Sequence, residues 1–211
     1  MKKRRLLSRT RFILLVCCVF TYPNLSHGVD MFGWFKKKEV FLSSEVKGVI
    51  TENGKPSANL EVTRSLMYID GKDHIDVAVT DIKGHFYFPK KTIRSSIPNR
   101  LFSEDRVSQH ITIEPNGELL PLWVATHIGI TEVPEFSKKL LSMACDLADK
   151  RVTFQFKNTN NEHLDHMASS ICRWREDYTP ILIYDGESQY IVEDGDFNKL
   201  TDRFTGKEVE L

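Results

Sequence analysis

Cys145 and Cys172 are the two cysteines that lie beyond the first 30 residues of this 211-residue chain. Two thiols in an oxidising compartment can close one disulfide, and here the bond would tie a strand to a helix. A loop-entropy account gives it about 3 kcal/mol of stabilisation. The alternative is two separate buried thiols that pack as small hydrophobic side chains.

His163 and His166 stand three positions apart in a segment with helical spacing, so both imidazoles would share one helix face. Two imidazoles on one face can ligate a metal, but a site needs further ligands. No other His or Cys pair with metal-site spacing occurs in the sequence. We therefore interpret the pair as part of a solvated helix face, and we expect no metal and no cofactor.

Asp194-Gly195-Asp196-Phe197-Asn198 resembles the start of a calcium loop. The loop pattern then fails, because Lys199 stands where glycine is required and Thr205 where glutamate is required. A polar turn is the interpretation that remains. Asp185-Gly186-Glu187 is likewise typical of a hairpin turn.

Catalytic motifs are absent from the sequence. It contains no G-x-S-x-G, no H-E-x-x-H and no G-x-x-x-x-G-K-[ST]. We therefore expect a non-catalytic protein without catalytic residues. An enzyme with an unrecognised site remains an alternative, because a catalytic set is defined by its three-dimensional geometry.

The stretch from Val46 to Phe88 predicts short antiparallel strands joined by tight turns. Apolar residues alternate with polar ones, and Gly-containing pairs interrupt the runs. We expect the alternating apolar side chains to face a core, namely Leu60, Val62, Ile75, Val77 and Val79. The turns are expected at Asn53-Gly54, Asp70-Gly71 and Lys83-Gly84.

This stretch resembles the carboxypeptidase regulatory-like domains, which are transthyretin-like β-sandwiches. Their pattern of a G-x-V and G-x-P strand pair, followed by T-D-x-x-G-x-F, is matched by Gly48, Ile50, Gly54, Pro56, Val62, Thr80, Asp81, Gly84 and Phe86. The resemblance covers about residues 44–90 and implies a non-catalytic module that braces, presents or binds. In physical terms, Gly54 and Gly84 suit turns with positive φ, Asp81 can cap its turn, and Phe86 can anchor a core.

The whole chain also resembles an uncharacterised proteobacterial family in which this hairpin precedes an L-x-x-x-C-D-L-like element. That element is Leu141-Ser142-Met143-Ala144-Cys145-Asp146-Leu147 in this sequence. The resemblance implies no activity.

Further strands are expected on both sides of the Val46–Phe88 stretch. We predict a first strand over residues 40–51, a long exposed loop over 90–106, and strands over 110–114 and 119–127. Trp123 has the opposite parity to Leu122 and Val124, which makes it either an edge residue or part of a binding face.

The C-terminal half is predicted to contain strands over 137–147 and 151–156 and then one helix over about 161–175. The first of these strands is ambiguous with a helix. The predicted helix has apolar residues three and four apart, with Asn160 or Asn161 as N-cap; these apolar residues are Leu164, Met167, Ala168, Ile171 and Trp174. Closing strands are expected over 181–184, over 190–192 and around Phe204.

The first 28 residues have the three parts of a secretory signal peptide. Six basic residues and no acidic one precede a short apolar run, and small residues follow it just before Val29. We expect cleavage after Gly28, a periplasmic location and no stable membrane span in the mature chain. Met31 offers an alternative start, which would make the protein cytoplasmic. Residues 29–39 combine aromatics with three lysines, as in a linker or an interfacial membrane anchor.

The fold class expected is mainly β: a transthyretin-like β-sandwich over residues 40–130, extended over 131–211 by additional strands and one amphipathic helix. After removal of the leader, 23 basic and 29 acidic residues remain, a net charge of −6 that argues against nonspecific nucleic-acid binding. We expect a non-catalytic exported binding protein. The specific hypothesis is an immunity protein that neutralises a toxin with a basic surface, and the alternative is a structural or assembly accessory of the cell envelope. We expect the features specific to this protein to lie in the loop over 90–106 or in the C-terminal half, outside the stretch with the family resemblance, but no individual partner-binding residue is indicated.

Overall fold

The computed structural model describes residues 36–100, 104–159 and 161–210. The predicted leader (residues 1–28), the cleavage site after Gly28, the alternative start at Met31 and the proposed cap Asn160 lie outside the described residues. By their contacts, Lys37–Leu211 group into one unit.

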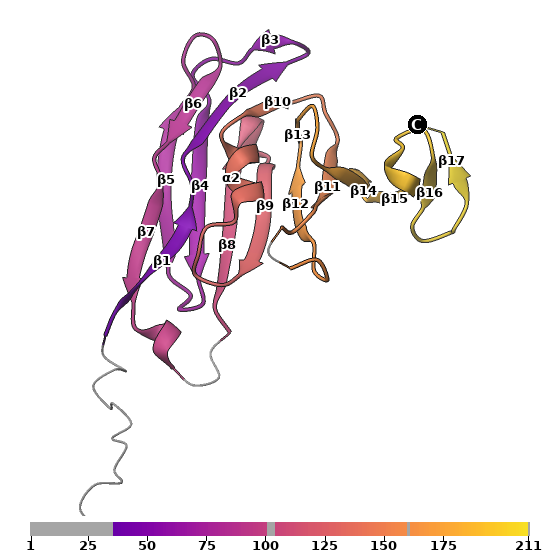
Figure 1. Ribbon diagram of the computed structural model, residues 1–211. Helices are drawn as coiled ribbons and strands as arrows, with labels where there is room; N and C mark the ends of the chain where they lie inside the picture. Colours follow the sequence, from indigo (N-terminus) through magenta and orange to yellow (C-terminus); the bar gives the residue numbers. More distant parts are fainter. Residues whose placement is uncertain (1–35, 101–103, 160, 211) are drawn as a thin grey trace, which may run out of the picture. The chain divides into compact units, whose positions relative to one another are not determined.

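An antiparallel sheet of ten strands is the largest element of this unit (Figure 1). From one edge to the other its strands are β17 (Glu208–Val209), β16 (Leu200–Asp202), β15 (Ser188–Val192), β14 (Thr179–Asp185), β11 (Arg151–Phe156), β12 (His166–Ser170), β9 (Leu120–Ile128), β8 (Arg106–Ile113), β4 (Glu61–Tyr68) and β5 (Asp73–Val79). Strands β9 and β12 are hydrogen-bonded neighbours. The boundary predicted near residue 130 therefore falls within one continuous sheet.

A second sheet packs against part of the first. It contains β2 (Val46–Glu52), β3 (Lys55–Pro56), β6 (His85–Phe88), β10 (Met143–Asp146) and β13 (Cys172–Arg173), with β2 and β10 parallel. Strands β1 (Lys38–Ser43) and β7 (Lys91–Ser95) form a separate pair. Within the described residues, the helical elements are α2 (Pro134–Leu140) and the short 3₁₀ turns η2 (Ile97–Asn99), η3 (Pro115–Gly117) and η4 (Glu193–Gly195).

Hydrophobic side chains from the two larger sheets meet in one core. Val62 and Ile111 contribute from the ten-stranded sheet, and Ile50 and Phe86 contribute from the second sheet; all are at most 4% exposed. Burial of this kind is the main favourable term in folding. The prediction of a mainly β sandwich with added strands and one helix is therefore confirmed, although the helix lies elsewhere in the chain.

The helix predicted over about 161–175 is wrong. Residues His166–Ser170 form β12, which pairs with β11 on one side and β9 on the other, and Cys172–Arg173 form β13. Leu164 and Met167 are more than half exposed, so their helical spacing does not mark a buried face. Two neighbouring strands supply the backbone hydrogen bonds here, and this tertiary context overrides the local pattern.

The helix is instead α2, within a region where a strand was predicted over 137–147. Pro134 stands at the first helical position, where its missing N–H costs nothing. Phe136 and Leu140 are four residues apart and both bury on the core side. Only the end of the predicted strand is extended, as β10. Among the described helices, none has the length and apolar character that crossing a membrane requires.

Trp123 is a core residue and neither an edge residue nor part of a binding face. It is fully buried, and its Nε1 donates to Oε1 of Gln109. The β8–β9 register shifts between Ile111, which faces Trp123, and Thr112, which faces Pro121. This bulge places consecutive residues of β9 on the buried side and breaks the parity on which the prediction depended.

The N-terminal strand and loop predictions also need correction. The single strand predicted over 40–51 is two strands, β1 and β2, which pair with different partners. The exposed loop predicted over 90–106 contains β7, which is paired with β1. Lys38 and Glu39, assigned to a linker, are the first residues of β1.

Candidate functional site

Strand β5 is an edge of the ten-stranded sheet and pairs with β4 alone (Figure 1). Alternate side chains along it point to solvent: Ile75 is 61% exposed, Val77 55% and Val79 59%. The expectation that these three residues face the core is therefore wrong. We call them the β5 stripe.

The polar side of β5 faces inward because Asp76 on that side forms an ion pair with a buried arginine. Arg64 on β4 is completely buried and donates to Asp76 over 2.6 Å, and Lys91 adds a second ion pair of 2.9 Å. Burial alone would raise the pKa of Asp76, but the hydrogen bonds from Lys91 and Arg64 outweigh burial and lower it. The apolar residues of β5 are therefore left on the outer face.

Most devices that protect an edge strand are missing from β5. Proteins block such edges with lysine, proline, bulges or inward-pointing charges. The register with β4 is continuous over seven residue pairs, and β5 contains no lysine and no proline. Its inward charge, Asp76, is already neutralised by Arg64 and Lys91. The backbone of β5 is therefore available to pair with another strand.

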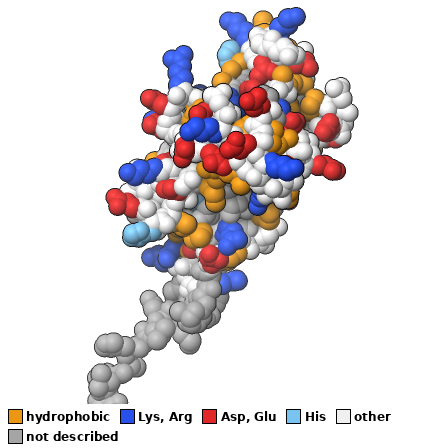
Figure 2. Space-filling model, turned by 90° about the vertical axis from the view of Figure 1, so that its right-hand side faces the viewer, with side chains coloured by type: hydrophobic (Ala, Val, Ile, Leu, Met, Phe, Trp, Pro, Cys, Tyr) orange, Lys and Arg blue, Asp and Glu red, His pale blue; other side chains and the backbone are white. Residues whose placement is uncertain are grey.

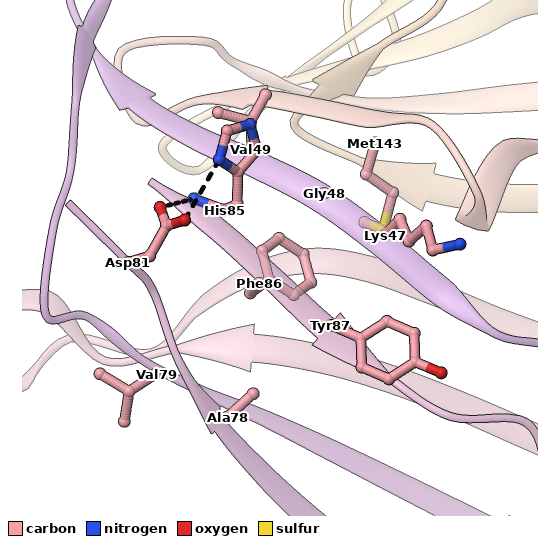
Figure 3. Close-up of a pocket in the computed structure, with 10 residues that line it drawn as sticks. All are labelled: Lys47, Gly48, Val49, Ala78, Val79, Asp81, His85, Phe86, Tyr87 and Met143. Atoms are coloured by element: carbon pink, nitrogen blue, oxygen red, sulfur yellow. Dashed lines mark hydrogen bonds and ion pairs between the residues drawn. The ribbon is translucent and has the colours of Figure 1, made fainter. Parts of the chain in front are cut away.

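A groove of ≈ 630 Å³ lies between β5 and β6, where these two strands diverge into different sheets (Figure 3). Ala78 and Val79 line it from β5, Phe86 and Tyr87 from β6, and Met143 from β10. Because these side chains are mostly apolar, the groove continues the hydrophobic character of the β5 stripe around the edge of the sheet.

Gly48 shapes one wall of the groove. It lies opposite Phe86 in the β2–β6 ladder, and a Cβ at this position would lie 2.3 Å from Cε1 of that ring. Glycine thus lets the aromatic ring lie against the β2 backbone. Next to this contact, Nζ of Lys47 lies 5.9 Å from the ring centre of Tyr87 at the rim.

The turn that joins β5 to β6 closes one end of the groove. Oδ1 of Asp81 accepts from the backbone N–H groups of Lys83 and His85, and these bonds lower the pKa of Asp81, that from His85 most. Gly84 has a φ of +79°, and a Cβ there would lie 2.3 Å from the carbonyl oxygen of Ile50. The turn role predicted for Asp81 and Gly84 is confirmed.

Cys145 and Cys172 form a disulfide. They are cross-strand neighbours in the β10–β13 ladder and are almost completely buried. The bond therefore joins two strands of the second sheet, and not a strand to a helix as predicted.

The two histidines of the predicted helix face do not share a helix. His163 lies in a turn, whereas His166 begins β12, and its ring centre lies 5.3 Å from that of Phe136. Among residues 36–100, 104–159 and 161–210, no group of three or more His, Cys, Asp or Glu side chains could hold a metal ion.

The segment that resembles a calcium loop is a polar turn, as predicted. It contains η4, and Nζ of Lys199 lies 3.5 Å from the Asp194 carboxylate. Asp196 caps the backbone N–H of Asn198 over 3.0 Å. Asp185 and Gly186 belong to the β14–β15 hairpin, also as predicted.

Sequence reasoning missed the β5 stripe. The alternation along β5 was visible, but alternation does not say which face of a strand meets the core. The direction in which β5 faces is decided by Asp76, which lies on the side of the strand opposite the stripe, and by its buried partner Arg64. Only Asp76 could be read from the strand itself.

Residues 46–150 match the sequence model of a family described as a domain of unknown function, DUF6795. The match begins at the first residue of β2 and includes β5, the groove and Cys145. It excludes Cys172 and the strands β11 to β17. No curated protein and no solved structure matches the chain. The candidate site thus lies wholly within the matched segment.

Proposed function

We propose that this chain is a non-catalytic binding protein that holds a partner protein by strand addition at β5. The observation that carries the proposal is the unprotected β5 edge with its exposed stripe. In strand addition, backbone hydrogen bonds along an open edge supply affinity, and alternate side chains supply specificity. The groove beside β5 would receive the inward-facing side chains of the added strand.

The specific function that we propose is that of a periplasmic immunity protein, which neutralises a toxin by direct binding. The leader-like N-terminus, the net charge of −6 after residue 28 and the disulfide support export and a basic partner surface. On the face that Figure 2 shows, acidic and basic side chains are interspersed, as is expected of a protein that does not bind nucleic acid. The transthyretin-like module would serve as the scaffold.

A cell-envelope accessory is the second candidate, and the same open edge favours it. Such a protein would brace an envelope component by the same strand addition, so the two candidates differ in their partners. An accessory should co-purify with envelope proteins, whereas an immunity protein should bind the product of a neighbouring toxin gene one to one.

The test is co-expression with that neighbouring gene, whose product is directed to the periplasm. We expect the wild-type chain to restore growth and Val77→Lys to lose protection, with binding at least tenfold weaker. The matched control is Thr63→Lys, which places the same charge directly opposite Val77 but one strand further in. Both positions face outward, so the free energy of unfolding should change by only about 0.5 kcal/mol.

Two results would contradict the proposal separately. A harmless neighbouring gene product would reject the immunity function. Equal loss of binding in both lysine variants, or in neither, would reject β5 as the binding edge.

A further inference from the structure

A second pocket, of ≈ 610 Å³, lies between α2 and β11 and shares no wall residue with the groove. Its wall includes Glu135 and Lys139 from α2, Phe156 from β11, Lys157 and Tyr178. Lys138 and Asp177 also line it, so aromatic rings and charged groups share the wall, and the charged groups are unevenly paired.

Lys139 is the unusual residue of this pocket. Lys139 is only 4% exposed. Its Nζ lies 5.5 Å from the ring centre of Tyr178 and 5.9 Å from that of Phe156. Nζ donates to the backbone carbonyl of Glu176, and among the described residues it forms no ion pair. Buried charges are normally paired because desolvation is costly.

The neighbouring carboxylates act on Lys139 only from a distance: Asp177 and Glu176 raise its pKa, but neither forms an ion pair with it among the described residues. Lys138 is paired with Asp177, and Oε1 of Glu135 accepts from the backbone N–H and the hydroxyl of Thr159. Lys157, also in the wall, forms no ion pair within the described part of the chain. The wall therefore holds three ammonium groups and two carboxylates, and two of the ammonium groups, those of Lys139 and Lys157, form no ion pair among the described residues. Burial lowers the pKa of Lys139, and it outweighs the opposing effect of Asp177 nearby.

We propose that this pocket binds a carboxylate carried on an aromatic body. The carboxylate would pair with Lys139 and Lys157, and the aromatic ring would pack on Phe156 and Tyr178. The carboxylate can come from a free aromatic acid or from a peptide that ends in an aromatic residue. This site is independent of the function proposed for β5.

The test is calorimetric titration of the intact protein with phenylacetate and with phenylacetamide, its neutral isostere. A second arm uses a short peptide ending in phenylalanine, with either a free or an amidated C-terminus. We expect the acid to bind at least tenfold more tightly than the amide in one arm, because a charge-assisted hydrogen bond is lost in the amide. The arm that shows the difference identifies the source of the carboxylate.

Three lysine variants complete the test. Lys139→Met should abolish the preference for the acid, and Lys157→Met should reduce it several-fold. Lys83→Met, at the exposed β5–β6 turn, should leave it unchanged. If Lys139→Met does not fold, Lys157→Met and the wild-type comparison still decide. Equal affinity for acid and amide in both arms, or an unchanged preference in Lys157→Met, would overturn the proposal.

Discussion

At the scale of single residues, Asp146 explains the C-D-L part of the element Leu141–Leu147. Its carboxylate accepts from Thr51 Oγ1 over 2.8 Å and from the backbone N–H groups of Asn53, Gly54 and Ala148 over 3.0, 2.7 and 3.0 Å. The N–H of Ala148 contributes most to lowering its pKa to about 2. One carboxylate thus fastens the β2–β3 turn to the end of β10.

Replacing this carboxylate with an amide should destabilise the fold. Asp146→Asn removes the charge and turns one acceptor into a donor, so we expect the free energy of unfolding to fall by about 2 kcal/mol at pH 7. The loss should be smaller at low pH. The folded-state pKa lies below the ordinary value, so the wild-type contribution exists above about pH 4 and disappears as the pH falls towards 2. Urea unfolding at both pH values measures this, with Asp149→Asn as control.

Equal stability of the two asparagine variants at pH 7 would contradict the role of Asp146. Asp149 is a suitable control because it lies three residues away, and its carboxylate has no hydrogen bond among those found in the described residues.

At the scale of elements, strands with turn chemistry could be predicted from the sequence. The turn at Asp81 to Gly84 and the strand β11 depend on local rules, namely side-chain capping and alternation. Strand β12 could not be predicted from its own sequence. It is defined by backbone hydrogen bonds to two other strands, β9 and β11, and these partners are not visible in the local pattern of residues. Of the candidate site, the alternation of the β5 stripe was predictable, but its exposure required knowledge of where β5 stands in the sheet.

His127 lies where β9, β12 and α2 meet, and it makes the stability of this junction dependent on pH. His127 is only 3% exposed, and neither nitrogen of its ring has a hydrogen-bond partner among the described residues. Burial, with a smaller contribution from His166 nearby, lowers its pKa to about 4. Glu135 acts in the opposite direction on His166, whose pKa is nevertheless lowered by burial.

We expect the free energy of unfolding to decrease by on the order of 2 kcal/mol between pH 6.5 and pH 4. In this range the unfolded chain binds a proton at His127 and the folded chain does not, so acid favours unfolding. His127→Leu should flatten this part of the pH profile, whereas His110→Leu, on the exposed face of β8, should not. Urea unfolding across the range provides the measurement, and identical profiles for wild type and His127→Leu would refute the assignment.

At the scale of the whole molecule, the disulfide connects the matched segment to the strands beyond it. Cys145 lies within residues 46–150 and Cys172 outside, and the bond closes a separation of 27 residues. Because both residues are buried, the bond should resist reductant in the folded protein. The compartment in which the chain folds therefore decides whether the bond exists.

Because the disulfide forms only in an oxidising compartment, the export proposal can be tested through the free energy of unfolding. A chain made from Met1 in a Gram-negative host should be recovered from the periplasm starting at Val29, with no thiol open to alkylation. The same chain made from Met31 in a reducing cytosol should carry two thiols and be less stable by about 3.5 kcal/mol, the loop-entropy value for a loop of this length. Cys145→Ala combined with Cys172→Ala should bring both preparations to a common stability, because neither can then form the disulfide. Recovery of a chain with an intact Met1, or of a periplasmic chain with free thiols, would contradict export with disulfide formation. Equal stability of the oxidised protein and the double alanine variant would show that the bond does not stabilise the fold.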